Sequence, residues 1–579
     1  MPRTLPPRVL LPLLVLPSLA LGADLQPLQL TGLDAELATN VRAHLSLESM
    51  SAAQRTRVSE TRLSYLLRVA PDEARQGLEP YGYYDAVITP EVIRDGDKVT
   101  VRLAVVLGEP VRVRALDVAV SAPGADDDLV AQRVAGFMPR VGDVFQSAVY
   151  EANKAAIARA LGERGYFDGQ LRARRVEVTR ADHTADIALA WDSGVRYRLG
   201  AVTFVGQQLR DGVLDPLVPW TAGEPFDQQR LLELQQSLLD TDFFSGIELQ
   251  PAPEKAVDHV VPMTVTLVPA KRSVYNLGLR YGTDSGAGIN ARLERRWLND
   301  RGHKLLLDLN IAQFKSNFTT QYKIPAFRWL DGWLTYQASL REEQIQDLST
   351  QTVDLAVTRS GRWRRWNLLA GLNYKRERAD SLSNDQHDYY TVVFPSVWGQ
   401  WKTSDNPNTP RRALGLTVEA RAGSASLGSD VDFLQVRAEG RWIRGLGASN
   451  RLLLRGELGT TVVDDFSLLP PSLRFYAGGD HSVRGFGYKE IGTVDGDLFG
   501  GKHLAVASAE FEHMFTPVWG AAVFIDAGDA FDDRFDAHVG VGAGLRWRSP
   551  VGPVRVDIAS DVSESDPGLR LHVSVGPDQ

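Results

Sequence analysis

The sequence predicts three small tandem α+β domains followed by a 16-stranded antiparallel transmembrane β-barrel. Three observations support this fold class. A short aromatic motif recurs three times in the first half of the chain. Helical periodicity ends near residue 272, and strict alternation of apolar and polar residues replaces it. No stretch after the first 22 residues holds 18 consecutive apolar residues, so a β-barrel is the spanning structure that remains available to this chain.

Composition excludes several classes of function. The chain has 579 residues, with 64 basic against 72 acidic residues and a net charge of -8, which offers no electrostatic surface for nucleic acid. It has no cysteine, which excludes disulfides, thiolate metal sites and cysteine nucleophiles. The metalloprotease pattern HExxH and the nucleophile pattern GxSxG are both absent from the sequence. We therefore predict no enzymatic activity, no catalytic residues, and no metal or other cofactor.

Residues 1–22 have the pattern of a signal peptide. Two arginines precede the apolar residues 9–21, and small residues mark a cleavage site. A transmembrane helix is the alternative, but Pro12 and Pro17 interrupt a stretch that is too short to span a membrane. The mature chain is therefore expected to be exported.

The recurring motif divides the first half into three domains. Its copies begin at Gly82, Gly165 and Asp242, at intervals of 83 and 77 residues, and read GYYD, GYFD and DFFS. Each copy follows a helical pattern and leads into a strand pattern, which predicts β-α-α-β-β units. The predicted boundaries are 23–107, 108–193 and 194–271. The strands predicted at 97–106 and 185–192 are expected to be sheet edges, which could accept extended segments or, as an alternative at least as strong, pack against a neighbouring domain.

Residues 272–579 are predicted to form the barrel. Leucines at 305, 307 and 309 share one face of a strand, and similar alternation recurs through about sixteen stretches. A soluble β-sandwich would also alternate. The tryptophans favour the barrel, because ten of the twelve follow residue 272 and several lie near strand ends, where aromatic girdles occur.

A long connection between the stretches 450–463 and 503–514 carries the strongest functional signal. It contains Arg484, and alternation places Glu510 and Asp526 on the inner face of nearby strands. A guanidinium on a loop folded into the lumen can pair with both carboxylates at once. The residues alone leave an equal alternative, in which Arg484 is a solvated loop charge and Asp526 an ordinary lumen residue.

These motifs resemble those of the Omp85 superfamily, whose tandem repeats are called POTRA domains. The resemblance lies in a V-R-G-F loop motif and an F-x-D-x-G strand motif, together with a hairpin at 544–553 and a turn at 405–410. It implies a contact between loop and lumen wall that involves Val483, Arg484, Gly485, Phe486, Glu510, Phe524, Asp526 and Gly528.

Three repeats and a chain that ends near Gly-Pro are similar to the TamA subfamily. This resemblance implies a place in the outer membrane of a Gram-negative bacterium, with the repeats in the periplasm. It also implies help in folding and inserting other β-barrels, such as autotransporters. The partners it implies are nascent β-barrel clients, outer-membrane lipid and a TamB-like protein anchored in the inner membrane.

A weak seam between the first and last strands is the expected working surface. It would join residues 274–282 to 568–576, with Leu277 and Val573 on the lipid face. Gly278, Gly576 and Pro577 would weaken it, since proline has no N–H to give to a strand ladder. A client strand could then pair at the exposed edge, and a cross-link between positions 278 and 573 would seal it.

Competing functions come from other classes. A passive porin would lack the tandem repeats and the paired loop and strand motifs. A two-partner secretion transporter would need an N-terminal plug helix, whereas residues 24–30 have a strand pattern. The outer-membrane end of a TamB-like lipid-transport bridge is a further alternative. An outer-membrane enzyme using Asp526 and Glu510 is disfavoured, because pairing with Arg484 explains both carboxylates.

Overall fold

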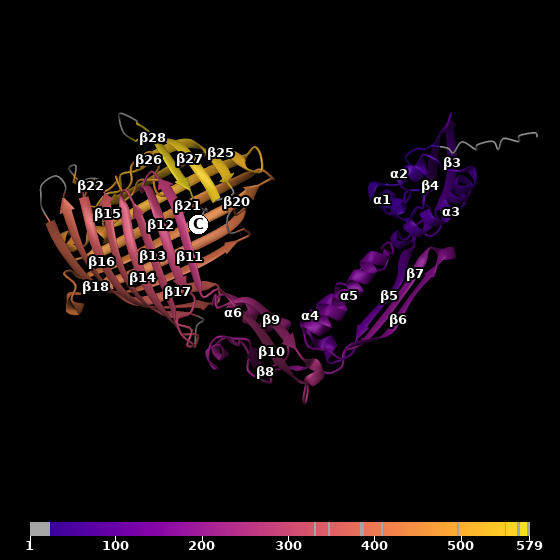
Figure 1. Ribbon diagram of the computed structural model, residues 1–579, viewed down its shortest axis with the longest axis horizontal. Coiled ribbons are helices and arrows are strands. Elements are labelled where there is room, and N and C mark those ends of the chain that lie inside the picture. Colours follow the sequence, from indigo (N-terminus) through magenta and orange to yellow (C-terminus); the bar gives the residue numbers. More distant parts are fainter. Residues whose placement is uncertain are drawn as a thin grey trace, which may run out of the picture. The chain divides into compact units, whose positions relative to one another are not determined.

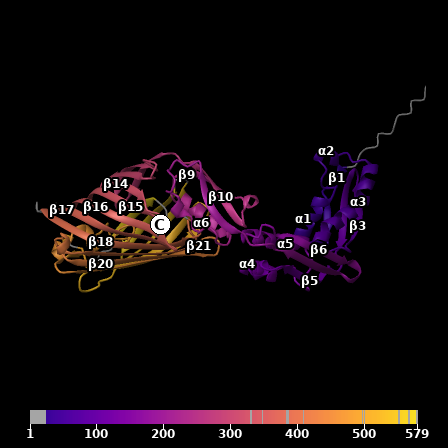
Figure 2. The ribbon, with the colours of Figure 1, turned by 90° about the horizontal axis from the view of Figure 1, so that it is seen from below.

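The computed structural model describes residues 24–328, 332–345, 348–381, 387–406, 409–494, 497–498, 500–549, 552–563 and 568–575. The predicted signal peptide and the seam residues Gly576 and Pro577 lie outside them. The chain forms two compact units (Figures 1 and 2). The first comprises Met1–Ala201, Trp220–Gln229 and Ala252–Pro262, and the second Val202–Pro219, Arg230–Pro251 and Met263–Gln579.

The first domain is a small sheet covered by helices. Its elements are β1 (Asp24–Leu25), β2 (Gln29–Thr31), α1 (Ala35–His44), α2 (Ala52–Arg55), α3 (Glu60–Leu78), β3 (Val87–Asp95) and β4 (Lys98–Val106). Residues 24–30, predicted to be extended, supply β1 and most of β2. Side chains of Asp34, Ser51 and Ser59 cap the three helices by accepting backbone N–H bonds. Leu66, Ala70 and Leu103 are among the fully buried core residues.

The second domain has the predicted β-α-α-β-β order, and the third departs from it. The second contains β5 (Arg112–Val120), α4 (Asp128–Ala135), α5 (Ser147–Glu163), β6 (Gln170–Thr179) and β7 (Thr184–Asp192). The third contains β8 (Arg198–Val205), α6 (Gln228–Leu239), β9 (Phe244–Pro251) and β10 (Val260–Pro269). A 3-10 turn at Asp215–Leu217 stands where a first helix was expected. Pro216 and Pro219 explain this, because proline removes a helical hydrogen bond and clashes with the preceding turn.

The strands expected to be sheet edges are central, so that prediction was wrong. β4 lies between β3 and the pair β1 and β2, and β7 lies between β5 and β6. Both strands have alternating buried residues and hydrogen-bonding neighbours on both sides. Sequence alternation reports which face of a strand is buried but not which strands flank it. β3, which pairs with β4 alone, forms one free edge of this sheet, and the short β1 and β2 form the other.

The three motif copies lie where one domain meets the next structural unit. Gly82, with a positive φ of 91°, accepts the N–H of Val111 at the start of the second domain. Gly165, with φ of 84°, accepts the N–H of Tyr197 at the start of the third. The third copy begins at Asp242, whose φ is also positive. The spacing of the repeats therefore follows from one turn reused at each junction.

The third copy contacts the barrel directly. Phe243 is fully buried, and its ring lies 5.9 Å from that of Trp333. The ammonium of Lys304 lies 4.8 Å from the Trp333 ring centroid and 3.5 Å from the carboxylate of Asp242. These contacts mark the barrel end next to the third domain, which in the following is called the near end.

The barrel wall is one sheet of 16 antiparallel strands in chain order, as predicted. The strands before the long connection are β11 (Ser273–Gly282), β12 (Gly286–Arg295), β13 (Lys304–Ala312), β14 (Lys315–Pro325), β15 (Trp333–Ile345), β16 (Leu348–Trp363), β17 (Trp366–Ser381), β18 (His387–Ser404), β19 (Arg412–Gly423), β20 (Phe433–Leu446) and β21 (Asn450–Val463). After it come β24 (His503–Met514), β25 (Trp519–Phe531), β26 (His538–Ser549), β27 (Gly552–Asp561) and β28 (Leu569–Val575). The connection holds the short strands β22 (Thr493–Val494) and β23 (Asp497–Leu498).

The two faces of the wall differ as the alternation predicted. Val523 and Ile525 of β25 are exposed on the outside, whereas Phe524 and Asp526 between and beside them are buried inside. The outer face is thus apolar over its middle, and the inner face carries the charges. Among the described residues, none of the helices is long and apolar enough to cross a membrane.

Candidate functional site

The long connection between β21 and β24, residues 464–502, crosses the inside of the barrel and is called the lumen loop. An apolar cluster joins it to the wall: Val483, Phe486 and Ile491 of the loop are buried with Leu504 and Val506 of β24. Apolar burial is non-directional, so it keeps the loop in the lumen without fixing its register. Polar contacts fix that register.

Arg484 contacts three strands of the wall through one guanidinium. Its Nε and Nη2 donate to the two carboxylate oxygens of Asp526 at 2.7 and 3.0 Å. Its Nη1 donates to Glu510 at 2.7 Å and to Asp557 at 3.0 Å. The guanidinium also lies 3.3 Å from the ring centroid of Phe524. Arg484 is only 5% exposed, so the alternative of a solvated loop charge is wrong.

A second arginine surrounds the same carboxylates. Arg546 of β26 donates to Glu510 at 2.8 Å and to Glu512 at 3.2 Å, and it also pairs with Asp557. Arg451 of β21 pairs with Glu512. Each buried carboxylate is therefore matched by a cation, which is the condition for burying charge at acceptable free-energy cost. Arg484, Glu510, Asp526, Arg546 and Asp557 are called the Arg484 cluster.

Two glycines permit this close approach. Gly485 has φ of 103°, a conformation that other residues rarely adopt, and its Cα faces the backbone of Ser560 and Asp561. Gly540 of β26 lies beneath Arg484, and a Cβ at position 540 would come within 1.7 Å of the Arg484 carbonyl oxygen. The wall therefore has room for the loop backbone only because residue 540 has no side chain.

The far part of the lumen loop is held by other strands. Tyr488 donates to the carboxylate of Glu343 on β15 at 2.7 Å, and Lys489 lies 3.2 Å from the same carboxylate. The backbone N–H of Ser472 donates to Glu377 on β17 at 3.1 Å. The loop is thus fastened to strands far apart in the sheet, from β15 to β27.

The seam between β11 and β28 is not a continuous ladder. Among the described residues, the backbones of these strands meet through Thr283 and Val573: the Thr283 N–H donates to the Val573 carbonyl at 3.3 Å. The Val573 N–H donates to the Thr283 hydroxyl at 3.1 Å. The remaining exposed edge carries large apolar side chains: Leu277, Leu279 and Leu569 are 85%, 89% and 81% exposed.

The lumen loop joins both sides of this seam through Asp480. The Asp480 carboxylate accepts from the Thr283 hydroxyl at 2.7 Å and contacts His572 Nδ1 of β28 at 2.7 Å. Its N–H donates to Asp284 at 2.9 Å. His572 Nε2 accepts the N–H of Gly485 at 3.0 Å, so Nδ1 carries the proton and donates to Asp480. Thr283, Asp284, Asp480 and His572 are called the seam junction.

Two carboxylates in the seam junction influence each other. Burial raises the pKa of Asp284, in the turn between β11 and β12, to about 6, and the nearby negative charge of Asp480 adds to the increase. Ligand atoms of Asp284, Asp480 and His572 lie within 4.8 Å of one another, a spacing that a metal ion would accept. Both ring nitrogens of His572 are already used in hydrogen bonds, so this group is satisfied without an ion.

The structure brings together most of the predicted site residues. Val483, Arg484, Gly485 and Phe486 meet Glu510, Phe524 and Asp526, while Gly528 lies two residues along β25 and paired with Val506. Leu277 and Val573 lie on the seam strands, but Val573 contacts Thr283 rather than the region of Gly278. The pairing of positions 278 and 573 is therefore wrong by five residues, because Thr283 directly follows the last residue of β11.

Sequence reasoning missed Asp557, His572, Arg546, Asp480 and Glu343 as site residues. Asp557 and His572 alternate with aliphatic residues along their strands, and this alternation was the available signal that they face the lumen. That signal gives the face of a residue but not its depth or its neighbours on other strands.

Comparison with known proteins identifies the family. A model of the Omp85 superfamily domain matches residues 298–578. The model for the first POTRA domain of TamA matches residues 27–107, and a POTRA model described as a surface antigen variable number repeat matches 197–269.

Similar proteins include two curated assembly factors and one solved structure. Outer membrane protein assembly factor BamA of Nitratidesulfovibrio vulgaris is 22% identical over 84% of this chain and 64% of its own length. The factor of the same name from Neorickettsia risticii is 24% identical over 73% of this chain and 60% of its own. The chain thus spans less than two thirds of either relative. BamA from Haemophilus ducreyi lacking POTRA domains 1–3 matches with a TM-score of 0.66 and 17% identity, covering 80% of this chain and 99% of that one.

Together these features define an outer-membrane β-barrel with POTRA domains, which in the Omp85 family lie in the periplasm. The chain is an Omp85 superfamily protein whose first POTRA domain is of the TamA type. The prediction that it is not an enzyme agrees with this family.

Gly540→Ala is expected to dislodge the lumen loop without removing a charge. The added Cβ overlaps the Arg484 carbonyl, and overpacking of this kind costs about 1–3 kcal/mol. The temperature at which the folded barrel loses its fast electrophoretic mobility in SDS should fall. Gly440→Ala in β20 is the matched control, because nothing lies within 4 Å of its added Cβ. Equal melting of both variants would show that residue 540 does not limit the approach of the loop.

Asp284→Asn is expected to stabilise the barrel at pH 7.5 but hardly at pH 3.5. A folded-state pKa of about 6, above the ordinary value of 3.8, means that the folded protein binds this proton more tightly. The associated stabilisation is present below about pH 4 and is lost as the pH rises through 6. The amide mimics the protonated acid, so the gain of the variant should grow between pH 4 and pH 6, where the wild type loses this stabilisation, and should be complete above that range. The same mobility assay at the two pH values measures this, and a gain equal at both would contradict it.

Proposed function

We propose that this protein assembles other outer-membrane β-barrels, such as autotransporters, by pairing their strands at its seam. The observation that carries the proposal is the incomplete junction of β11 and β28. Every other neighbouring pair in the wall forms a ladder, whereas in the part of the chain that the structure describes these two strands meet through Thr283 and Val573.

Inside a membrane, an unpaired strand edge strongly favours hydrogen bonding to another strand. Hydrocarbon offers no partner for backbone N–H and C=O groups, and each group left unpaired costs several kcal/mol. Residues Ser273–Gly282 of β11 pair with β12 on one side. A client strand that adds on the other side satisfies both its own groups and those of β11. The exposed Leu277 and Leu279 would pack against apolar side chains of that client.

The seam junction supports a controlled edge rather than a permanently open one. Asp480 of the lumen loop reaches Thr283 on one side and His572 on the other, so the loop holds the two strand ends together. Separation of the seam requires the loss of these few hydrogen bonds, each with a net contribution of about 0.5–3 kcal/mol. Such a barrier is low enough for a binding client to overcome.

A disulfide between Thr283→Cys and Val573→Cys is expected to stop client assembly under oxidising conditions, with recovery on reduction. The natural chain has no cysteine, so the engineered pair has no competitor. The measurement is the amount of an autotransporter client reaching its folded, surface-exposed form. Ala521→Cys with Leu545→Cys, which are register partners on β25 and β26, provides a cross-link in a sealed part of the wall.

The control pair should leave assembly unchanged. If the oxidised seam pair assembled the client as well as the control does, strand pairing at the seam would be refuted. Loss of lipid export with intact client assembly would instead favour the lipid-bridge function.

We also propose that a TamB-like protein anchored in the inner membrane binds the first domain. The match of residues 27–107 to a TamA-type POTRA domain supports this partner. We place the binding surface at the free edge of β3, because this strand carries the exposed apolar residues Val87, Val92 and Ile93. A photocross-linking residue at Ile93 should trap the partner, and one at the exposed Thr39 of α1 should not. Equal cross-linking from both positions, or from neither, would rule out β3 as the binding edge.

A further inference from the structure

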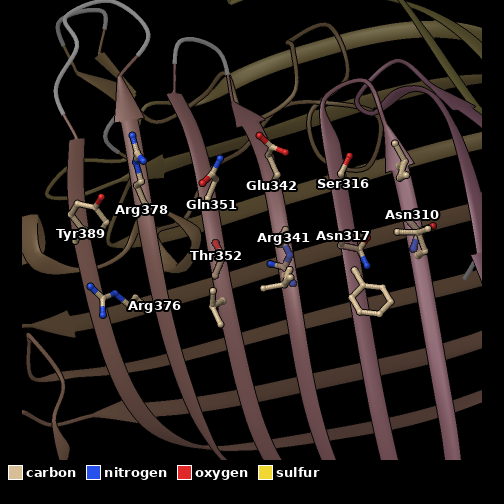
Figure 3. A pocket seen from close by; sticks show the side chains of 15 residues that line it. Asn310, Ser316, Asn317, Arg341, Glu342, Gln351, Thr352, Arg376, Arg378 and Tyr389 are labelled. Carbon is tan, nitrogen blue, oxygen red and sulfur yellow. The ribbon is translucent and has the colours of Figure 1, made fainter.

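The outer face of the barrel carries a groove that the assembly function does not use. It has a volume of about 530 Å³ and runs across β13 to β18 (Figure 3). Its labelled polar side chains come from these six neighbouring strands, with Arg376, Arg378 and Tyr389 together on β17 and β18.

Two rows of residues define the groove, and strand register aligns each row across the wall. The lower row is apolar: Leu309 pairs with Phe318, Phe318 with Leu340, and Leu340 with Val353. Each of these side chains is exposed, so the row lies on the outside of the barrel. The row ends at Arg376, the register partner of Val353.

The upper row is polar. Ser316 pairs with Glu342, Glu342 with Gln351, Gln351 with Arg378, and Arg378 with Tyr389. Because side chains on one face recur every second residue, this row lies directly beside the apolar row and farther from the near end. The boundary between apolar and polar surface therefore runs through the groove.

Arg376 lies at the depth of lipid headgroups. Arg376 lies ten residues along β17 from Trp366, the first residue of that strand. Trp366 lies at the near end, beside the turn after β16, and Arg362 of β16 pairs there with Asp240 of the third domain. At about 3.3 Å per residue and a tilt of about 45°, this segment covers on the order of 23 Å of membrane depth. The apolar band of such barrels is about 25 Å tall, so Arg376 marks its outer edge.

The charges in the groove favour an anion at one end. Among the described residues, Arg376 has no carboxylate partner, and its guanidinium lies 5.9 Å from the Tyr389 ring centroid. The Nε of Arg378 lies 2.8 Å from the carboxylate of Asp380, and the two terminal nitrogens of its guanidinium can still donate to a ligand. Glu342 lies two strands from Arg378, about 9.6 Å away at ordinary strand spacing. Because its negative charge repels an anion, an anion in the groove is confined to the end that holds the two arginines.

We propose that this groove binds the phosphorylated, acylated glycolipid of the outer leaflet. A phosphate of the headgroup accepts hydrogen bonds from Arg376 and Arg378, and one acyl chain lies along Phe318, Leu340 and Val353. The sugar lies against the Tyr389 ring and Gln351. The combination of a cationic pair with an adjoining apolar row selects an anionic amphiphile over a zwitterionic lipid or a free phosphate.

Native mass spectrometry of the full chain in detergent, titrated with bisphosphorylated lipid A, tests the proposal. Arg376→Gln is expected to weaken lipid A binding about tenfold, the effect of losing one charge-assisted hydrogen bond. Arg376→Lys should retain most of the binding, because it keeps the charge. Leu340→Asn should also weaken it by removing apolar contact. Arg534→Gln, in an exposed loop, is the matched control and should bind as the wild type does.

Each variant is first checked for folding by its mobility in SDS before and after heating. Phosphatidylethanolamine, which carries no net charge, and glucosamine phosphate, which has no acyl chain, should bind at least tenfold more weakly than lipid A. Equal lipid A binding by the wild type and folded Arg376→Gln would overturn the proposal. So would binding of phosphatidylethanolamine as tight as that of lipid A.

Discussion

The contact of Arg484 with three wall strands is the constraint on which the interior of the barrel depends. One guanidinium meets Asp526, Glu510 and Asp557, and it is too buried for water to replace any of them. Loss of one member would leave a buried charge without its partner, at a cost of about 3–5 kcal/mol. The lumen loop is therefore held at one position rather than at a set of similar ones.

That position determines what the loop does at the seam. Gly485, the residue after Arg484, donates its N–H to His572 on β28. Asp480, four residues before Arg484, contacts both His572 and Thr283. A loop displaced by even 1 Å would lose hydrogen bonds of this length. The strongly bonded part of the loop thus positions the weakly bonded seam junction, and the two differ in strength because one is a network of ion pairs and the other a few hydrogen bonds.

Alternation along strands was enough to predict the barrel and the inner face that holds Glu510 and Asp526. It was not enough to predict the Arg484 cluster in full. Asp557 lies 73 residues from Arg484 in sequence, and its contribution depends on the register of β27 against β26, which no local pattern encodes. The same limit explains why Val573 was paired with Gly278 instead of Thr283. It also explains why β4 and β7, whose buried faces were evident, were mistaken for sheet edges.

Buried ion pairs seldom stabilise a fold more than apolar residues of the same volume would, so stability alone does not account for the Arg484 cluster. Apolar packing of Val483 and Phe486 already keeps the loop inside the barrel. What the ion pairs add is direction, because a guanidinium fork can donate to carboxylates in few orientations. Position matters here because the loop contacts a seam whose strands, over the described residues, meet through few hydrogen bonds. Under the proposed function the seam opens for a client, so its closed state must be set by something other than its own ladder. The contacts of the lumen loop would set it.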